Sequence, residues 1–170
     1  MQKSFISIIS FTIFLTIFIT IMSGENSANF KIKSTYYWPT PNFHGISSYF
    51  GYRKSPTKGA SSNHKGIDIL ANEKSIVCAI ADGKVKYAGF NASGGYMVII
   101  SHAGNMESRY AHLDSTPLVK AGESVKKGSI IGKVGPKYLK NGKLNGATTG
   151  VHLHLGVLKN GEFIDPLKLF

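Results

Sequence analysis

Cysteine is nearly absent from this sequence. The 170 residues include one cysteine, Cys78, so no disulfide can form within the chain. A fold without that cross-link must be stabilised by packing, or by packing and a bound metal ion. Cys78 lies in the apolar run 75–81 with no charged neighbour in sequence. We therefore interpret it as a small buried residue and not as a catalytic thiol.

Helical periodicity is missing after residue 30, and so is the motif His-Glu-x-x-His. The second absence excludes the zinc proteases in which a glutamate of that motif is the general base. Short apolar runs rich in β-favouring residues alternate instead with turns, in which many of the 19 glycines lie. We predict strands over 96–102 and 108–113, and two further short strands within 119–134.

Turn residues separate these runs. Ala81-Asp82-Gly83 and Asn160-Gly161 are typical of β-hairpins. The prolines in 38–41 exclude regular structure there, and a single helical turn is expected near 165–167. The fold class that we predict is mostly β, an antiparallel β-sandwich or partly open barrel, preceded by an N-terminal hydrophobic helix.

Charged residues are absent between Phe5 and Met22. We interpret 1–24 as a signal peptide or a membrane anchor, 25–37 as a short polar linker and 38–170 as one domain. No clear small-x-small cleavage site follows the apolar run, and no cysteine lies at its end, which argues against a lipoprotein. With Lys3 inside, the domain is expected outside the cytoplasm, either secreted to the cell wall or periplasm or anchored facing outward.

Acidic residues are scarce. The chain has 9 Asp and Glu against 20 Lys and Arg, a formal charge of +11. Such a charge suits a polyanionic neighbour, and both nucleic acid and the anionic polymers of a bacterial wall would satisfy it. Because the domain is expected to be exported, we predict the anionic wall polymers as partners and no nucleic acid. An uncleaved N-terminal segment would add the membrane as a partner.

Histidines gather in a stretch near the C-terminus, 150–157. Alternate side chains of a strand share a face, so His152 and His154 are predicted to project to the same side of an apolar strand. Two imidazoles there are costly to desolvate unless they are hydrogen-bonded or bind a metal ion. His44 and His102 lie outside the histidine-containing motifs, and we interpret them as surface or structural histidines.

The segment 64–68 provides a second group of candidate ligands. If it is extended, His64 and Asp68 share a face with Gly66, which has no side chain to block the space between them. One imidazole and one carboxylate can then converge on a single ion. Asp68 lies in the apolar run 67–71, where an unpaired carboxylate would be costly.

A third group lies in 109–114. Alternation predicts Tyr110 and His112 on one strand face and Ala111 on the other. Glu107 has the parity of Ala111, so we expect it to face away from His112. Asp68 is then the only acid of the three stretches that is suited to the site. A hydrolase built from these residues must move protons with histidine.

Together these motifs resemble those of the lysostaphin-like (LytM-type) zinc metallopeptidases. The shared motifs are His-x-x-x-Asp at 64–68, Tyr-Ala-His-Leu at 110–113, His-x-His at 152–154, and the segments 48–53, 81–85 and 119–128. The similarity covers about residues 38–168. It implies a β-rich fold of the duplicated hybrid motif type, a groove between loops, and hydrolysis of peptide cross-links or stem peptides of peptidoglycan.

The resemblance also implies a role for each residue. His64, Asp68 and His154 would bind one Zn²⁺ per chain and leave a fourth position for water. His112 and His152 would be the catalytic pair, one taking a proton and the other stabilising the oxyanion, in either order. Which peptidoglycan bond is cut stays open between glycine bridges and D-amino-acid stems.

Two alternatives to an active peptidase were weighed. An inactive relative would bind the wall and activate other hydrolases, but here all five metal and catalytic positions are intact. A lipoyl or biotinyl carrier resembles 119–131, but explains neither the histidines nor the N-terminal segment. Latent family members carry an asparagine that fills the fourth zinc position. Asn29 and Asn42 lie in no such motif, so we expect an uninhibited site.

Overall fold

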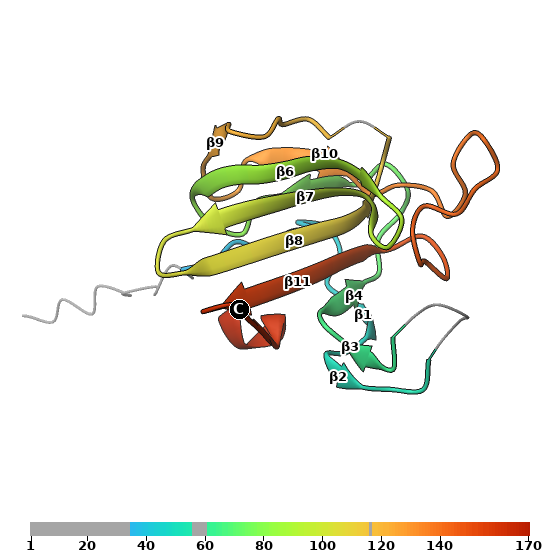
Figure 1. The fold of residues 1–170 in the computed structure, drawn as a ribbon, viewed down its shortest axis with the longest axis horizontal. Helices are drawn as coiled ribbons and strands as arrows, with labels where there is room; N and C mark the ends of the chain where they lie inside the picture. Colours follow the sequence, from blue (N-terminus) through green and yellow to red (C-terminus); the bar gives the residue numbers. More distant parts are fainter. Residues whose placement is uncertain (1–34, 56–60, 116) are drawn as a thin grey trace, which may run out of the picture. The chain divides into compact units, whose positions relative to one another are not determined.

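An antiparallel sheet of eight strands contains three of the five predicted site residues, Asp68, His112 and His154 (Figure 1). The computed structural model describes residues 35–55, 61–115 and 117–170. The predicted signal peptide or anchor at 1–24, with its hydrophobic helix, lies outside the described residues, as does most of the linker. Among the residues that are described, no helix is long and apolar enough to cross a membrane.

The elements are short, and all strand pairs are antiparallel. They are β1 Ile46–Ser48, β2 Gly51–Tyr52, β3 Asn63–His64, β4 Ile67–Ile69, β5 Ile76–Cys78, β6 Gly83–Asn91, β7 Gly95–His102, β8 Met106–Leu113, β9 Ser124–Val125, β10 Ile130–Lys133, β11 Leu153–Lys159, β12 Glu162–Ile164 and the 3-10 helix η1 Pro166–Leu169. The large sheet has the order β1-β4-β11-β8-β7-β6-β9, with β12 paired to β11. Two further pairs, β10-β5 and β2-β3, complete the described strands. The prediction of a mostly antiparallel β fold is confirmed, and over the described residues no sheet closes into a barrel.

Most predicted strands and turns are present. β7 and β8 match 96–102 and 108–113 to within two residues, and β9 and β10 lie within 119–134. Asn160 and Gly161 have φ values of 53° and 84° and join β11 to β12 as a two-residue hairpin. The Asp165 carboxylate accepts a hydrogen bond from Leu167 N at 3.0 Å and caps η1.

The predicted hairpin at 81–83 is wrong. The turn connects β5 to β6, but β5 pairs with β10, while β6 pairs with β7 and β9. Next to the turn, the Ile80 N–H donates to the hydroxyl of Tyr110 at 2.9 Å. This backbone group is therefore satisfied by a buried side chain and not by a hairpin partner.

The core lies under one face of the large sheet. Ile67 and Ile69 of β4, Leu153 and Leu155 of β11 and Tyr110 of β8 are fully buried. Burying a side chain of this size contributes about 1.5–3 kcal/mol to folding. These apolar side chains occupy every second position, so the positions between them, Asp68 on β4 and His154 on β11, face the other side of the sheet, as the sequence predicts. Cys78 is also buried, which raises the pKa of its thiol and agrees with a structural role.

A bulge breaks the alternation of β8. The register between β7 and β8 shifts by one residue, so that Ala111 and His112 both lie opposite Met97. His112 has a left-handed φ of 59°. The prediction that Tyr110 and His112 share a face is therefore wrong, because one extra residue moves the following side chain to the other face. Tyr110 is buried in the core, whereas Ala111 and His112 line a pocket.

Candidate metal centre and active site

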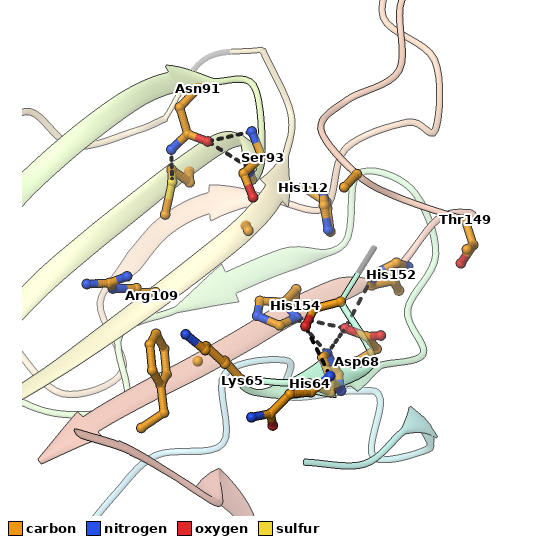
Figure 2. Close-up of a pocket in the computed structure, with 18 of the residues that line it drawn as sticks. His64, Lys65, Asp68, Asn91, Ser93, Arg109, His112, Thr149, His152 and His154 are labelled. Carbon is orange, nitrogen blue, oxygen red and sulfur yellow. Dashed lines mark hydrogen bonds and ion pairs between the residues drawn. The ribbon is translucent and has the colours of Figure 1, made fainter. Parts of the chain in front are cut away.

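A pocket of about 490 Å³ lies over β8 and β11 and is bordered by residues of β3 and β4. Its lining includes all five predicted site residues (Figure 2). They come from four strands and one loop. β3 contributes His64, β4 Asp68, β8 His112 and β11 His154, and His152 lies directly before β11. The structure thus brings together side chains that are up to 90 positions apart in sequence.

Three donor atoms meet at one point of this pocket. His64 Nε2 lies 3.1 Å from Asp68 Oδ1 and 3.1 Å from His154 Nδ1, and the last two atoms are 2.9 Å apart. A tetrahedral zinc ion with bonds of about 2.0–2.1 Å requires donors roughly 3.3 Å apart. The observed separations are close to that value. Two imidazoles and one carboxylate are also ligand types that zinc prefers, so this set of donors fits the ion.

Backbone contacts orient the imidazole of His64. Its Nδ1–H donates to the carbonyl oxygen of Tyr49 at 2.8 Å. With the proton on Nδ1, the lone pair of Nε2 points at Asp68 and His154. Such a hydrogen bond on the second ring nitrogen is the usual way in which proteins set the tautomer of a metal-binding histidine.

Asp68 is held in its ionised form. Burial alone would raise its pKa, but hydrogen bonds with His154 and His64 lower the pKa far below the usual range. Its second oxygen, Oδ2, accepts a hydrogen bond from Arg53 Nη1 at 3.1 Å, and the same nitrogen donates to the hydroxyl of Ser48. Arg53 therefore engages one oxygen and leaves Oδ1 directed at the two histidines.

The segment 64–68 is not one continuous strand as expected. β3 pairs with β2, β4 pairs with β1 and β11, and the chain is irregular between them. His64 and Asp68 converge all the same. Gly66 is required at the break because a Cβ atom would lie 2.4 Å from the Leu155 carbonyl oxygen and 2.8 Å from the His154 ring. The glycine thus makes room for a ligand side chain.

Two more histidines face the donor cluster. The ring centroids of His112 and His152 are 4.9 Å apart, and His152 Nε2 lies 3.6 Å from Asp68 Oδ1. Burial, together with the neighbouring His152 and His154, lowers the pKa of His112 to about 4. Burial also lowers the pKa of His152. In this structure both rings therefore favour the neutral form, which can accept a proton.

Asn145 determines how the His112 ring is presented. The Nδ1–H of His112 donates to the Asn145 carbonyl oxygen at 2.8 Å, which leaves Nε2 free in the pocket. The reasoning from sequence missed this residue, because it lies in the loop after β10 and belongs to no recognised motif. It also missed Arg53, although that residue ends the segment 48–53, which was noted for its resemblance to the metallopeptidases.

The remaining predictions concern residues outside the pocket. His44 is exposed and stacks on Trp38, and His102 binds the Asp82 carbonyl and Ser108, in agreement with surface and structural roles. Glu107 shares the β8 face of Arg109, contrary to the expectation that it points away from the site. It is bound by Lys86 and Arg109 and does not line the pocket. Among the described residues that line the pocket, Asp68 is the only acid.

Residues 62–166 match the sequence pattern of Peptidase family M23. Among curated relatives, the DD-carboxypeptidase/endopeptidase Mpg of Neisseria meningitidis serogroup B is 36% identical over 124 residues, which are 73% of this chain and 26% of that protein. The murein hydrolase activator NlpD of Escherichia coli K12 is 35% identical over 138 residues, 79% of this chain and 31% of its own length. The chain thus spans about a quarter to a third of these relatives.

Solved structures agree with this match. A zinc-containing peptidase from Vibrio cholerae superposes with a TM-score of 0.64 at 32% identity, over 75% of this chain and 37% of that one. The catalytic domain of lysostaphin from Staphylococcus simulans superposes with a TM-score of 0.60 at 30% identity, over 75% of this chain and 91% of that domain. The sequence resemblance to lysostaphin-like peptidases is confirmed by both comparisons.

Proposed function

The chain belongs to peptidase family M23, and we propose that it is a zinc-dependent endopeptidase that hydrolyses peptide bonds of peptidoglycan. One observation carries the proposal. Three donor atoms of His64, Asp68 and His154 lie 2.9–3.1 Å from one another, and two further histidines share the same pocket. A structural ion would need no such additional pair, since closed sites use four protein ligands.

The mechanism divides the work among the chain's own side chains. When bound, zinc lowers the pKa of water and polarises a carbonyl group. Asp68 and its partner Arg53 keep the ligand oxygen oriented. His112 and His152 present unprotonated ring nitrogens beside the ligands, so that one can take a proton from the attacking water. The other can donate a hydrogen bond to the developing oxyanion when it is itself protonated, in either order of roles.

The proposed place of action lies outside the cytoplasm, where peptidoglycan is found. Mpg is named as a carboxypeptidase and endopeptidase, and NlpD as an activator of murein hydrolases. Both names refer to cell-wall chemistry. The formal charge of +11 would add attraction to anionic wall polymers.

The NlpD relative supports a second candidate function. A protein that activates other hydrolases binds the wall and a partner enzyme, and does not require its own catalytic residues. This chain retains His112 and His152 together with the three donors, so we rank hydrolysis first. The two functions differ in one observable, the appearance of new peptide termini when the purified chain acts alone.

The test is to incubate the full chain, with zinc or with a chelator, with purified peptidoglycan from several bacteria, and to identify new termini by mass spectrometry. Cleavage that chelation abolishes and zinc restores is expected. His64→Ala, Asp68→Ala and His154→Ala should lower both bound zinc and turnover. His112→Ala and His152→Ala should keep near-normal zinc and lose about a hundredfold or more in turnover.

Three outcomes would count against the proposal. Full activity of a verified metal-free chain would contradict the zinc mechanism. Loss of zinc in His112→Ala would contradict the division between ligands and catalysts. If the zinc-loaded chain released no peptide but increased cleavage by an added hydrolase, the activator function would replace the peptidase.

A further inference from the structure

The two ends of the pocket differ in charge. Lys65 and Arg109 line one end, and Figure 2 shows them beyond His154 from His112 and His152. Phe163 also lines this end. The Lys65 ammonium and the Arg109 guanidinium each lie 5.2 Å from the centre of its ring. An aromatic face holds both cations in place but does not neutralise them.

Acidic side chains do not balance this charge. Glu107 accepts from Arg109 Nε at 2.7 Å and from Lys86 at 2.8 Å, so one carboxylate is shared by two cations. Among the described residues, no carboxylate pairs with Lys65. At the other end of the pocket, Asp68 is already engaged by Arg53 and the histidines. The end formed by Lys65, Arg109 and Phe163 therefore carries an excess of positive charge.

The strand register sets the distance between this end and the metal ligands. On β11, His154 is opposite Ala111 and Gly156 is opposite Arg109. Two residues along a strand span roughly 7 Å. Ala111, level with His154, and Gly156, level with Arg109, both line the pocket, and both are small. One pocket extends from the histidines to the cations, so an extended peptide bound in it can reach both.

We infer that Lys65 and Arg109, over Phe163, form a subsite for a carboxylate of the peptide that is cut. This inference rests on the proposed function. A peptide residue spans at most about 3.6 Å, so the carboxylate belongs one or two residues from the scissile bond. Because the cations share a pocket with the metal ligands, the anion is part of the substrate itself and not a wall polymer that binds elsewhere.

The experiment compares two synthetic cross-linked stem peptides with the same sequence. One carries free carboxylates beside the cross-link, and the other carries carboxamides at the same positions. The zinc-loaded full chain is expected to cleave the carboxylate form with kcat/KM about tenfold higher or more, because hydrogen bonds to charged groups are worth that much. Lys65→Met and Arg109→Gln should each bring this ratio toward one, whereas Lys65→Arg should retain it.

Lys84→Met is the matched control, because Lys84 is an exposed lysine of β6 that does not line the pocket. Its ratio should equal that of the unmodified chain, and a fall in this ratio would show that overall charge and not the subsite selects the substrate. Calorimetric binding of the two peptides to the zinc-loaded His112→Ala variant should show the same preference as cleavage.

Equal cleavage of the two peptides by the unmodified chain would overturn the subsite and leave the peptidase intact. Inhibition by soluble polyglycerol phosphate that Lys65→Met relieves, without any carboxylate preference, would reassign the subsite to phosphate. If the zinc-loaded chain cleaved neither the two peptides nor peptidoglycan, the proposed function itself would be contradicted.

Discussion

His112 and Asn145 are joined by a hydrogen bond of 2.8 Å from the imidazole Nδ1 to the backbone carbonyl oxygen. The side chain of Asn145 binds both strands beside the bulge, accepting from Tyr96 N at 3.0 Å and donating to the Leu113 carbonyl at 2.9 Å. A left-handed backbone costs a residue with a Cβ atom roughly 1–2 kcal/mol. The buried amide of Asn145 thus stabilises the backbone that presents His112 to the pocket.

Replacing this amide should affect catalysis more than metal binding. Asn145→Ala leaves buried backbone groups of β7 and β8 without partners, so the free energy of unfolding should fall by about 2–4 kcal/mol. Turnover should fall roughly ten- to hundredfold, because the His112 ring loses its position. Zinc content should stay near that of the unmodified chain. Thermal denaturation, metal analysis and kinetics measure the three effects.

Asn141→Ala is the matched control for this substitution, since Asn141 makes an exposed turn contact with Lys143 N. It should change neither turnover nor stability appreciably. If Asn145→Ala lost stability but kept full turnover, the link between the bulge and catalysis would be wrong.

Arg53 should tune zinc affinity without being a ligand. Arg53→Leu removes the donor to Asp68 Oδ2, and loss of such an outer partner typically weakens metal binding about 10–100-fold. Arg53→Lys keeps the charge but loses the planar fork, so its zinc affinity should lie between those of Arg53→Leu and the unmodified chain. Competition with a chelating dye gives the zinc affinity of each variant. Lys74→Met breaks the exposed ion pair with Asp114 and should leave zinc affinity unchanged. An Arg53→Leu variant with normal affinity would refute the orienting role.

Gly66 should tolerate no side chain. A Cβ at this position meets the Leu155 carbonyl oxygen at 2.4 Å and the His154 ring at 2.8 Å, so Gly66→Ala must displace backbone or a ligand ring. We expect lower zinc content and at least a tenfold loss of turnover. Gly132→Ala, whose Cβ would meet Leu113 Cδ1 at an ordinary 3.4 Å, serves as the control. Equal zinc occupancy in the two variants would contradict the packing argument for Gly66.

The metal-free chain should lose stability in mild acid through His112. Burial holds the pKa of His112 at about 4 in the folded chain, against an ordinary value of 6.5. Between these values the unfolded chain binds a proton that folded His112 does not. The free energy of unfolding should therefore rise with pH from about 4 to 6.5 and level off above. The contribution is about 3 kcal/mol, since each pKa unit corresponds to about 1.36 kcal/mol.

Urea denaturation across this pH range, in the presence of a chelator, measures the effect. His112→Gln should remove part of the rise, and the rest belongs to other groups such as His152, whose pKa is also lowered by burial. An identical pH dependence in His112→Gln and the unmodified chain would show that His112 does not titrate in this way.

Local sequence determined much of this protein. A period of two through residues 152–155 placed His152 and His154 on one side and Leu153 and Leu155 in the core, since strand geometry is set by adjacent residues. Apolar runs and turn residues located β7, β8 and the hairpin at Asn160 and Gly161 for the same reason. The proposed ligand set His64, Asp68 and His154 could also be named, through the family resemblance of the short motifs in which these residues lie.

Only the tertiary structure decided where these side chains meet and which residues support them. The bulge that turns His112 away from Tyr110 depends on contacts with Asn145, 33 positions along the chain. Arg53, directly after β2, reaches Asp68 of β4 through an ion pair. Lys65 and Arg109 come to one end of the pocket because both lie over the ring of Phe163. Alternation along one strand carries no information about such partners. Their positions follow from the packing of elements that are distant in sequence, which sets side-chain direction and charge together.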